Sequence, residues 1–128
     1  MLGTSPVEKA AVASWNHKIE GECFAAIAEV LRNTAKAMAG RALPGPNDYA
    51  QIPELAERGR ARLVHFLDRF EQHMEGRDWV ATDTFSLADI TAGVALDFAG
   101  WVKVEVNEGR PAIAKWREKL AARASFSL

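Results

Sequence analysis

The side chains that could do chemistry in this chain are one cysteine, three histidines and a few carboxylates on predicted helices. Cys23 falls mid-helix on an apolar stripe with no identifiable base, so we expect it to be a buried hydrophobic residue and not a nucleophile. His65 and His73 are eight residues apart on another predicted helix, too far for the i, i+4 spacing of a metal pair. No further ligand spacing completes a site, so metal binding is not expected.

Asp89 and Asp97 lie on one predicted helix and could suggest an acid and base pair. Asp89 is explained by helix capping, because residues 85–90 have the order of a helix start. Ser86 is the predicted N-cap and Asp89 its capping-box partner, while Phe85 and Ile90 form the predicted hydrophobic staple. The role of Asp97 stays open: if it is buried, we expect it to hold a backbone amide or an arginine.

Apolar residues three or four positions apart predict the helices that carry these groups. The predicted helices run from Ser5 to about Met38, from Ile52 to about Glu75, from Ser86 to roughly Val104, and from near Arg110 onward. The third is apolar almost all round, so we expect it at the centre of a bundle, and Gly59 in the second leaves room for a close neighbour. The fold class is therefore all-α, a helical bundle in one domain covering residues 1–128.

Charge and composition exclude several function classes. Sixteen Lys and Arg against seventeen Asp and Glu give a net charge of −1 at pH 7, so we expect no nucleic-acid partner. The most apolar stretch, 85–104, contains charged residues, so we expect no membrane span. No signal peptide is visible and a single cysteine allows no internal disulfide, which indicates the cytoplasm. A cluster of three arginines, Arg58, Arg60 and Arg62, predicts a solvated helix face. The alternative is that it binds the acidic surface of a partner.

The helix start at residues 85–90 resembles the capping-box and staple signature of glutathione transferases, which opens the helix buried in their C-terminal domain. Residues 79–83, 110–116 and 2–10 are similar to the family in the same way, so the resemblance covers essentially the whole chain. Thr82 stands where the family usually has Gly, and Ala124 where it often has Pro. Both departures lie in turns or ends. The expected fold is the helical C-terminal domain of a bacterial-type glutathione S-transferase.

The resemblance implies that glutathione, the cosubstrate of the family, is held by an upstream thioredoxin-like domain that also supplies the catalytic residue. We expect that domain to be absent here, so the chain would be truncated, with no cofactor or catalytic residue of its own, and inactive alone. The resemblance also implies that the helical domain forms one wall of a pocket for a hydrophobic electrophile. The substrate-wall candidates are Trp15, His17, Lys18 and Glu22, each of which could instead be an ordinary packing or solvated residue.

Two functions follow from this interpretation, and whether the chain serves an enzyme stays open. The first is the substrate side of a glutathione-transferring parent, to which this half contributes shape and proximity. The alternative is a stand-alone protein–protein interaction module, because helical domains of this type also serve as assembly adaptors. In either case the bare interface needs the thioredoxin-like domain or another partner protein, and we expect a homo-oligomer.

Overall fold

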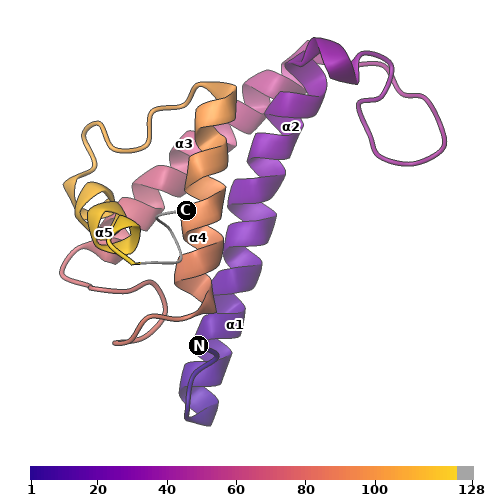
Figure 1. Ribbon diagram of the computed structural model, residues 1–128. Helices are drawn as coiled ribbons and strands as arrows, with labels where there is room; N and C mark the ends of the chain where they lie inside the picture. The colour runs from indigo at the N-terminus through magenta and orange to yellow at the C-terminus, as the bar shows by residue number, and fades with distance from the viewer. Residues whose placement is uncertain (124–128) are drawn as a thin grey trace.

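The computed structural model describes residues 1–123, and its elements within that range are all helices (Figure 1). The α-helices are α1 (Pro6–Lys18), α2 (Ala25–Thr34), α3 (Pro53–Met74), α4 (Leu87–Ala99) and α5 (Pro111–Ala121). A π-helix, η1 (Ile19–Phe24), joins α1 and α2 into one continuous rod. With this rod counted once, the predicted bundle of four principal helices is confirmed. The predicted site residues all fall within the described range, whereas Ala124 lies outside it.

The rod begins as expected and ends earlier than expected. The hydroxyl of Ser5 accepts the Glu8 amide at 3.1 Å, and Pro6 occupies the first helical position. The rod ends at Thr34 and not near Met38, because Ala35 turns to an extended conformation. The side-chain amide of Gln51 donates to the carbonyls of Arg32 at 3.0 Å and Ala35 at 2.7 Å, which satisfies free acceptors at this end.

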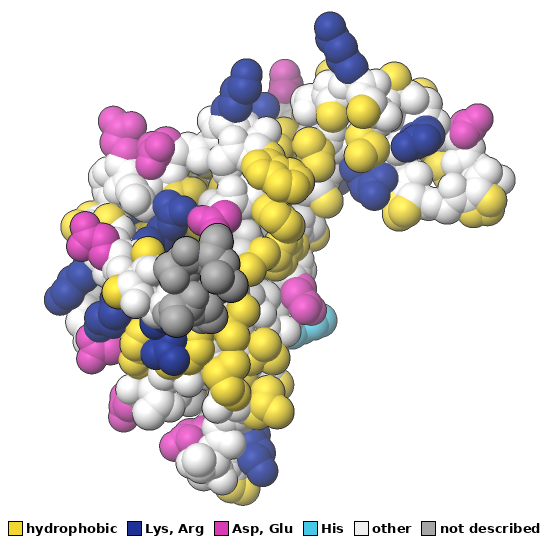
Figure 2. Space-filling model, in the orientation of Figure 1, with side chains coloured by type: hydrophobic (Ala, Val, Ile, Leu, Met, Phe, Trp, Pro, Cys, Tyr) yellow, Lys and Arg dark blue, Asp and Glu magenta, His cyan; other side chains and the backbone are white. Residues whose placement is uncertain are grey.

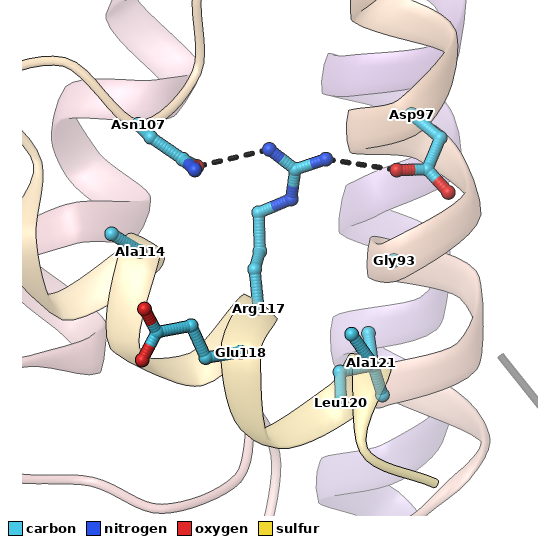
Figure 3. Close-up of a pocket in the computed structure, with 8 residues that line it drawn as sticks. All are labelled: Gly93, Asp97, Asn107, Ala114, Arg117, Glu118, Leu120 and Ala121. Carbon is cyan, nitrogen blue, oxygen red and sulfur yellow. Dashed lines mark hydrogen bonds and ion pairs between the residues drawn. The ribbon is translucent and has the colours of Figure 1, made fainter. Parts of the chain in front are cut away.

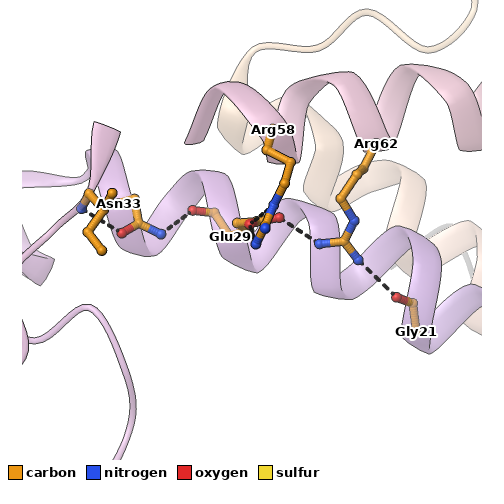
Figure 4. Close-up of polar contacts among 6 residues, drawn as sticks. Gly21, Glu29, Asn33, Arg58 and Arg62 are labelled. Atoms are coloured by element: carbon orange, nitrogen blue, oxygen red, sulfur yellow. Dashed lines mark hydrogen bonds and ion pairs between the residues drawn. The ribbon is translucent and has the colours of Figure 1, made fainter. Parts of the chain in front are cut away.

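α2 and α3 approach closely at Gly59. A methyl group there would lie 2.9 Å from the Ala26 carbonyl oxygen and 2.9 Å from Val30 Cγ2, so the predicted close contact is confirmed. Beside this contact the Glu29 carboxylate accepts hydrogen bonds from Arg58 and Arg62 of α3 (Figure 4). This arrangement joins the two helices on the side where glycine lets their backbones meet.

The prediction of a solvated arginine face holds for Arg58 and Arg60, which are exposed, but all three arginines also make contacts beyond α3. Arg58 and Arg62 share the Glu29 carboxylate, which is only 9% exposed. Arg62 also donates to the Gly21 carbonyl of η1 at 3.3 Å, and Arg60 donates to the Val102 carbonyl at 2.6 Å. Each guanidinium therefore bridges α3 to another element, because long side chains can reach past their own helix to unsatisfied acceptors.

α4 starts at a buried polar centre. The structure has a capping box here, with the Ser86 amide donating to Asp89 Oδ2 at 3.0 Å and the Ser86 hydroxyl also accepting the Ala88 amide at 3.3 Å. Asp89 is fully buried, and its Oδ1 accepts the Val80 amide and the Trp116 indole N–H, both at 2.9 Å. One carboxylate therefore fixes the loop before α4, the start of α4 and the α5 helix.

The other features at the ends of α4 differ in part from expectation. Phe85 lies edge-on to Trp79 with ring centroids 5.3 Å apart, and its staple contact with Ile90 stays a prediction. α4 ends at Ala99, short of Val104, since a 3₁₀ turn follows and Lys103 adopts a left-handed conformation with φ 61°.

α5 is capped by a residue from another helix. The Glu71 carboxylate of α3 accepts the Ala112 amide at 2.7 Å and the Ile113 amide at 2.8 Å. Arg110 precedes α5 and offers no side-chain cap of its own. Glu71 thus supplies both acceptors and a negative charge at the positive end of the α5 dipole, and it ties α3 to α5.

Candidate functional site

Three of the four predicted substrate-wall residues lie together in a groove between the rod and α3, which we call the Trp15 groove. Its volume is about 370 Å³, and its lining comprises Trp15, Lys18, Glu22, Phe66, Arg69, Phe70, Gln72 and His73. The half-buried Trp15 ring lies 4.0 Å from the His73 ring, and the Lys18 amine is 4.7 Å from the Trp15 ring centroid. Glu22 pairs with Arg69 at 3.5 Å. The groove thus has an aromatic floor and a rim of mostly paired charges.

His73 also lines this groove. From the sequence we considered it only as a metal ligand, and its spacing from His65 argued against that role. Its Nε2 lies 2.6 Å from the Val80 carbonyl oxygen, so this nitrogen carries the hydrogen and donates. Burial lowers the pKa of His73, the Val80 carbonyl opposes the shift, and the Arg77 and Lys18 charges add to it. The shift favours the neutral form of the ring, which offers a flat stacking surface.

His17, the fourth predicted residue, lies in a different cavity, which we call the His17 cavity. It has a volume of about 520 Å³ and is lined by Leu2, Lys9, Val12, Ala13, Asn16, His17, Glu20 and Leu87. The chain start closes one side, since the Leu87 amide donates to the Met1 carbonyl at 2.8 Å. Asn16 donates to Glu20 at 3.2 Å and accepts a hydrogen bond from Thr91 of α4. The cavity thus combines apolar walls with a polar rim.

A run of apolar side chains, the α4 stripe, continues from this cavity along the outer side of α4. Its members are Leu87, Ile90, Val94, Phe98 and Trp101, three or four residues apart, with Val94 36% and Trp101 66% exposed. Figure 2 shows apolar side chains gathered along the face formed by α4 and the rod. Exposed apolar surface of this kind is typical of binding surfaces.

A third cavity, between α4 and α5, answers the open question about Asp97. Arg117 donates to Asp97 at 2.8 Å and to Asn107 at 2.9 Å across a space of about 400 Å³ (Figure 3). The Asp97 side chain is 64% exposed, so it holds an arginine at the surface and not in the core. The Arg117 guanidinium pairs with the Asp97 carboxylate. The buried Asp89 carboxylate accepts hydrogen bonds from two backbone amides and an indole N–H. The two aspartates therefore form no acid and base pair.

Cys23 offers no nucleophile. It is fully buried, and burial raises the pKa of its thiol to about 12, so the thiol stays protonated near neutral pH. Within residues 1–123 no cluster of three His, Cys, Asp or Glu side chains could hold a metal ion. No helix in that range is long and apolar enough to span a bilayer.

Comparison with known proteins assigns the fold to one family. Residues 25–124 match the family model described as Glutathione S-transferase, C-terminal domain. Glutathione S-transferase 2 of Saccharomyces cerevisiae is 29% identical over 126 residues, covering 98% of this chain and 52% of that protein. The chain thus spans about half the length of this relative.

Solved structures agree with the sequence match. The crystal structure of Gtt2 from Saccharomyces cerevisiae superimposes with a TM-score of 0.86 and 27% identity, over 99% of this chain and 59% of that chain. A class Gtt2 glutathione S-transferase of Vibrio parahaemolyticus gives a TM-score of 0.78 and 28% identity, over 98% and 54%.

Proposed function

The chain belongs to the glutathione S-transferase family, as its C-terminal domain, and from this premise we propose that it forms the hydrophobic-substrate side of a glutathione-transferring enzyme. A thioredoxin-like domain, on this or another chain, would bind glutathione and supply the group that activates the thiol. The helical domain would hold an apolar electrophile beside the sulfur, contributing proximity and shape. Alone, the helical domain would be inactive.

The observation that carries this proposal is the His17 cavity at the end of the α4 stripe. Leu87 belongs to both, so a domain that covers the stripe would also close the cavity. Ligand pockets occur preferentially at such domain interfaces, with apolar walls and a few polar groups. Leu2, Val12 and Leu87 would face the electrophile.

His17 is the residue we propose to act on the substrate from this wall. It is exposed and lies on the polar rim with Asn16, where it can donate a hydrogen bond to a polar group of the electrophile or to the thiolate. Trp15, Lys18 and Glu22 line the Trp15 groove. They remain a second candidate wall, on the side of the rod that faces α3.

Binding of a nitroaromatic electrophile to the isotope-labelled chain distinguishes these two walls. We expect amide shifts at Ala13, His17 and Leu87 and none at Glu22. Ala13→Glu should abolish the shifts, whereas Ser14→Glu, which adds the same charge at the neighbouring exposed position, should preserve them. Shifts centred on Trp15 and Glu22 would move the electrophile to the Trp15 groove, and no saturable shift at either site would refute a substrate wall in this domain.

Turnover tests the division of labour between the two halves. The chain alone should not conjugate glutathione to the nitroaromatic compound, whereas the chain joined to a glutathione-binding half should. In that fusion His17→Ala should lower kcat/KM by about tenfold to a hundredfold if its hydrogen bond acts in the transition state, and His65→Ala, an exposed histidine on α3, should not. Turnover by the chain alone would overturn the proposal.

The α4 stripe also favours the second candidate function, a stand-alone interaction module. Trp101 is 66% exposed at the far end of the stripe from the His17 cavity, so it could anchor a partner protein without any electrophile. We propose the cytoplasm as the compartment and self-association through the stripe. Trp101→Ser should then shift sedimentation toward the monomer, and a monomeric wild type would contradict self-association.

A further inference from the structure

A small basic pocket lies where the end of α3 meets α5. Its volume is about 160 Å³, and its lining comprises Met74, Gly76, Arg77, Asp78, Ala112, Lys115, Trp116 and Lys119. Three of these side chains are cationic and one is a carboxylate. The pocket shares no lining residue with the His17 cavity, so what it binds is independent of the proposed transferase role.

Two of the cations are held in place by contacts with the loop that follows α3. Gly76 ends the helix at φ +74°, a conformation that favours glycine, and so turns the chain toward α5. The Arg77 guanidinium donates to the carbonyls of Ala81 at 3.3 Å and Trp79 at 3.4 Å. The Lys119 amine lies 5.3 Å from the Trp79 ring centroid. Their positive charges are therefore positioned before any ligand arrives.

The pocket wall includes one carboxylate, that of Asp78. This carboxylate pairs with Lys119, and this hydrogen bond and charge lower the pKa of Asp78, with Lys115 adding to the effect. Lys115 and Lys119 both line the pocket together with this carboxylate. Lys115 has no ion pair of its own within residues 1–123. The Asp78 side chain is 71% exposed and carries a single charge, so a ligand can displace it into solvent at little cost.

The Glu71 carboxylate at the start of α5 is engaged by backbone donors. It accepts the amides of Ala112 and Ile113, so its charge is compensated at the start of α5. The three cations Arg77, Lys115 and Lys119 thus exceed the single free carboxylate, Asp78, on the pocket wall.

We propose that this pocket binds a small dianionic oxyanion, the phosphoryl group of a phosphate ester or inorganic phosphate, which takes the place of the Asp78 carboxylate. A dianion with several acceptor oxygens can engage Lys115 and Lys119 together, which one carboxylate does less well. The volume of about 160 Å³ suits a phosphoryl group with a few attached atoms.

Titration of the isotope-labelled chain with inorganic phosphate at constant ionic strength tests the site. We expect saturable shifts at Gly76, Asp78 and Lys115. Asp78→Asn removes the competing charge and should tighten binding about three- to tenfold, and Lys115→Gln should weaken it by a similar factor. Lys36→Gln, which removes an exposed lysine near the far end of the rod, is the matched control and should change nothing.

Thermal melts without phosphate should be alike for the four proteins, because the substituted side chains are at the surface.

A second titration with O-phosphoserine identifies the source: tighter binding than phosphate assigns the site to phosphate esters, and equal binding assigns it to free phosphate. Shifts that do not saturate, equal weakening by Lys36→Gln, or weaker binding by Asp78→Asn would each overturn the site.

Discussion

Removing the Asp89 carboxylate should destabilise the chain far more than loss of a helix cap would. From capping alone a substitution of this residue costs about 1–2 kcal/mol. In the structure, however, Asp89→Ala leaves three buried donors without their acceptor: the amides of Val80 and Ser86 and the indole N–H of Trp116. Each buried donor left without an acceptor costs about 1–3 kcal/mol, so the three together cost at least about 3 kcal/mol, a large part of the roughly 5–15 kcal/mol by which a domain is stable.

Asp89→Asn should give an intermediate loss, which separates the cap from the rest of the network. Its side chain keeps an oxygen for Val80 and Trp116, which share Oδ1, but places an NH₂ group opposite the Ser86 amide. The cost should be that of half a capping box, about 1–2 kcal/mol. Asp97→Asn, on the same helix but in an exposed ion pair with Arg117, is the control and should cost less than about 1 kcal/mol.

Urea unfolding followed by circular dichroism, with extrapolation to water, measures these differences. A double-mutant cycle of Asp89→Ala with Trp116→Phe should show a coupling of about 0.5–1.5 kcal/mol, since each change removes one partner of the Asp89–Trp116 hydrogen bond. Asp89→Ala within 1 kcal/mol of the wild type, or additive effects in the cycle, would refute the claim that one carboxylate holds three segments together.

Four further outcomes follow from the same structure. Gly59→Ala should destabilise by about 1–3 kcal/mol because its methyl group meets α2, whereas Gly100→Ala, with open space around it, should be neutral or slightly stabilising in the same urea assay. Glu71→Gln should lower the free energy of unfolding by about 1–2 kcal/mol through weaker capping of α5, and unchanged stability would contradict that contact. Cys23 should resist an aryl disulfide reagent at pH 8 until urea unfolds the chain, because burial raises its pKa to about 12; rapid labelling of the native protein would be the contrary result. The lowered pKa of His73 means that the unfolded chain takes up a proton before the folded chain does, so melting temperatures should fall as the pH drops below the ordinary value of 6.5, and His73→Gln should flatten the dependence between pH 7 and 5.

The helices were predictable because each leaves its own signal in the chain. The Ser5-Pro6 and Ser86-Asp89 starts have local hydrogen-bonding partners, so a few neighbouring residues determine them. The Glu71 cap of α5 left no such signal, since its donors lie about forty residues away in sequence and meet it only after α3 and α5 pack. The reach of Arg58 and Arg62 to Glu29 depends on packing in the same way.

The sequence predicts only in part how the four candidate substrate-wall residues are distributed between the two cavities. Trp15, Lys18 and Glu22 are three and four residues apart, which places them on one side of a helix, and His17 falls outside that spacing. Which side faces α3 and which faces the start of α4 depends on the tertiary arrangement. The π-helix did leave a signal: the apolar stripe advances by four residues from Trp15 to Ile19, Cys23 and Ile27, more than the 3.6 residues of an α-helical turn.

The π-helix η1 sets the rotational phase between the two halves of the rod. If all six residues of η1 became α-helical, one half of the rod would rotate against the other by about 100°. The phase of α1 toward α4 and that of α2 toward α3 could then no longer both be kept, so either the Asn16 contact with Thr91 or the Glu29 contact with α3 would be lost. Folded relatives that lack this π-helix should therefore have one residue fewer in the segment.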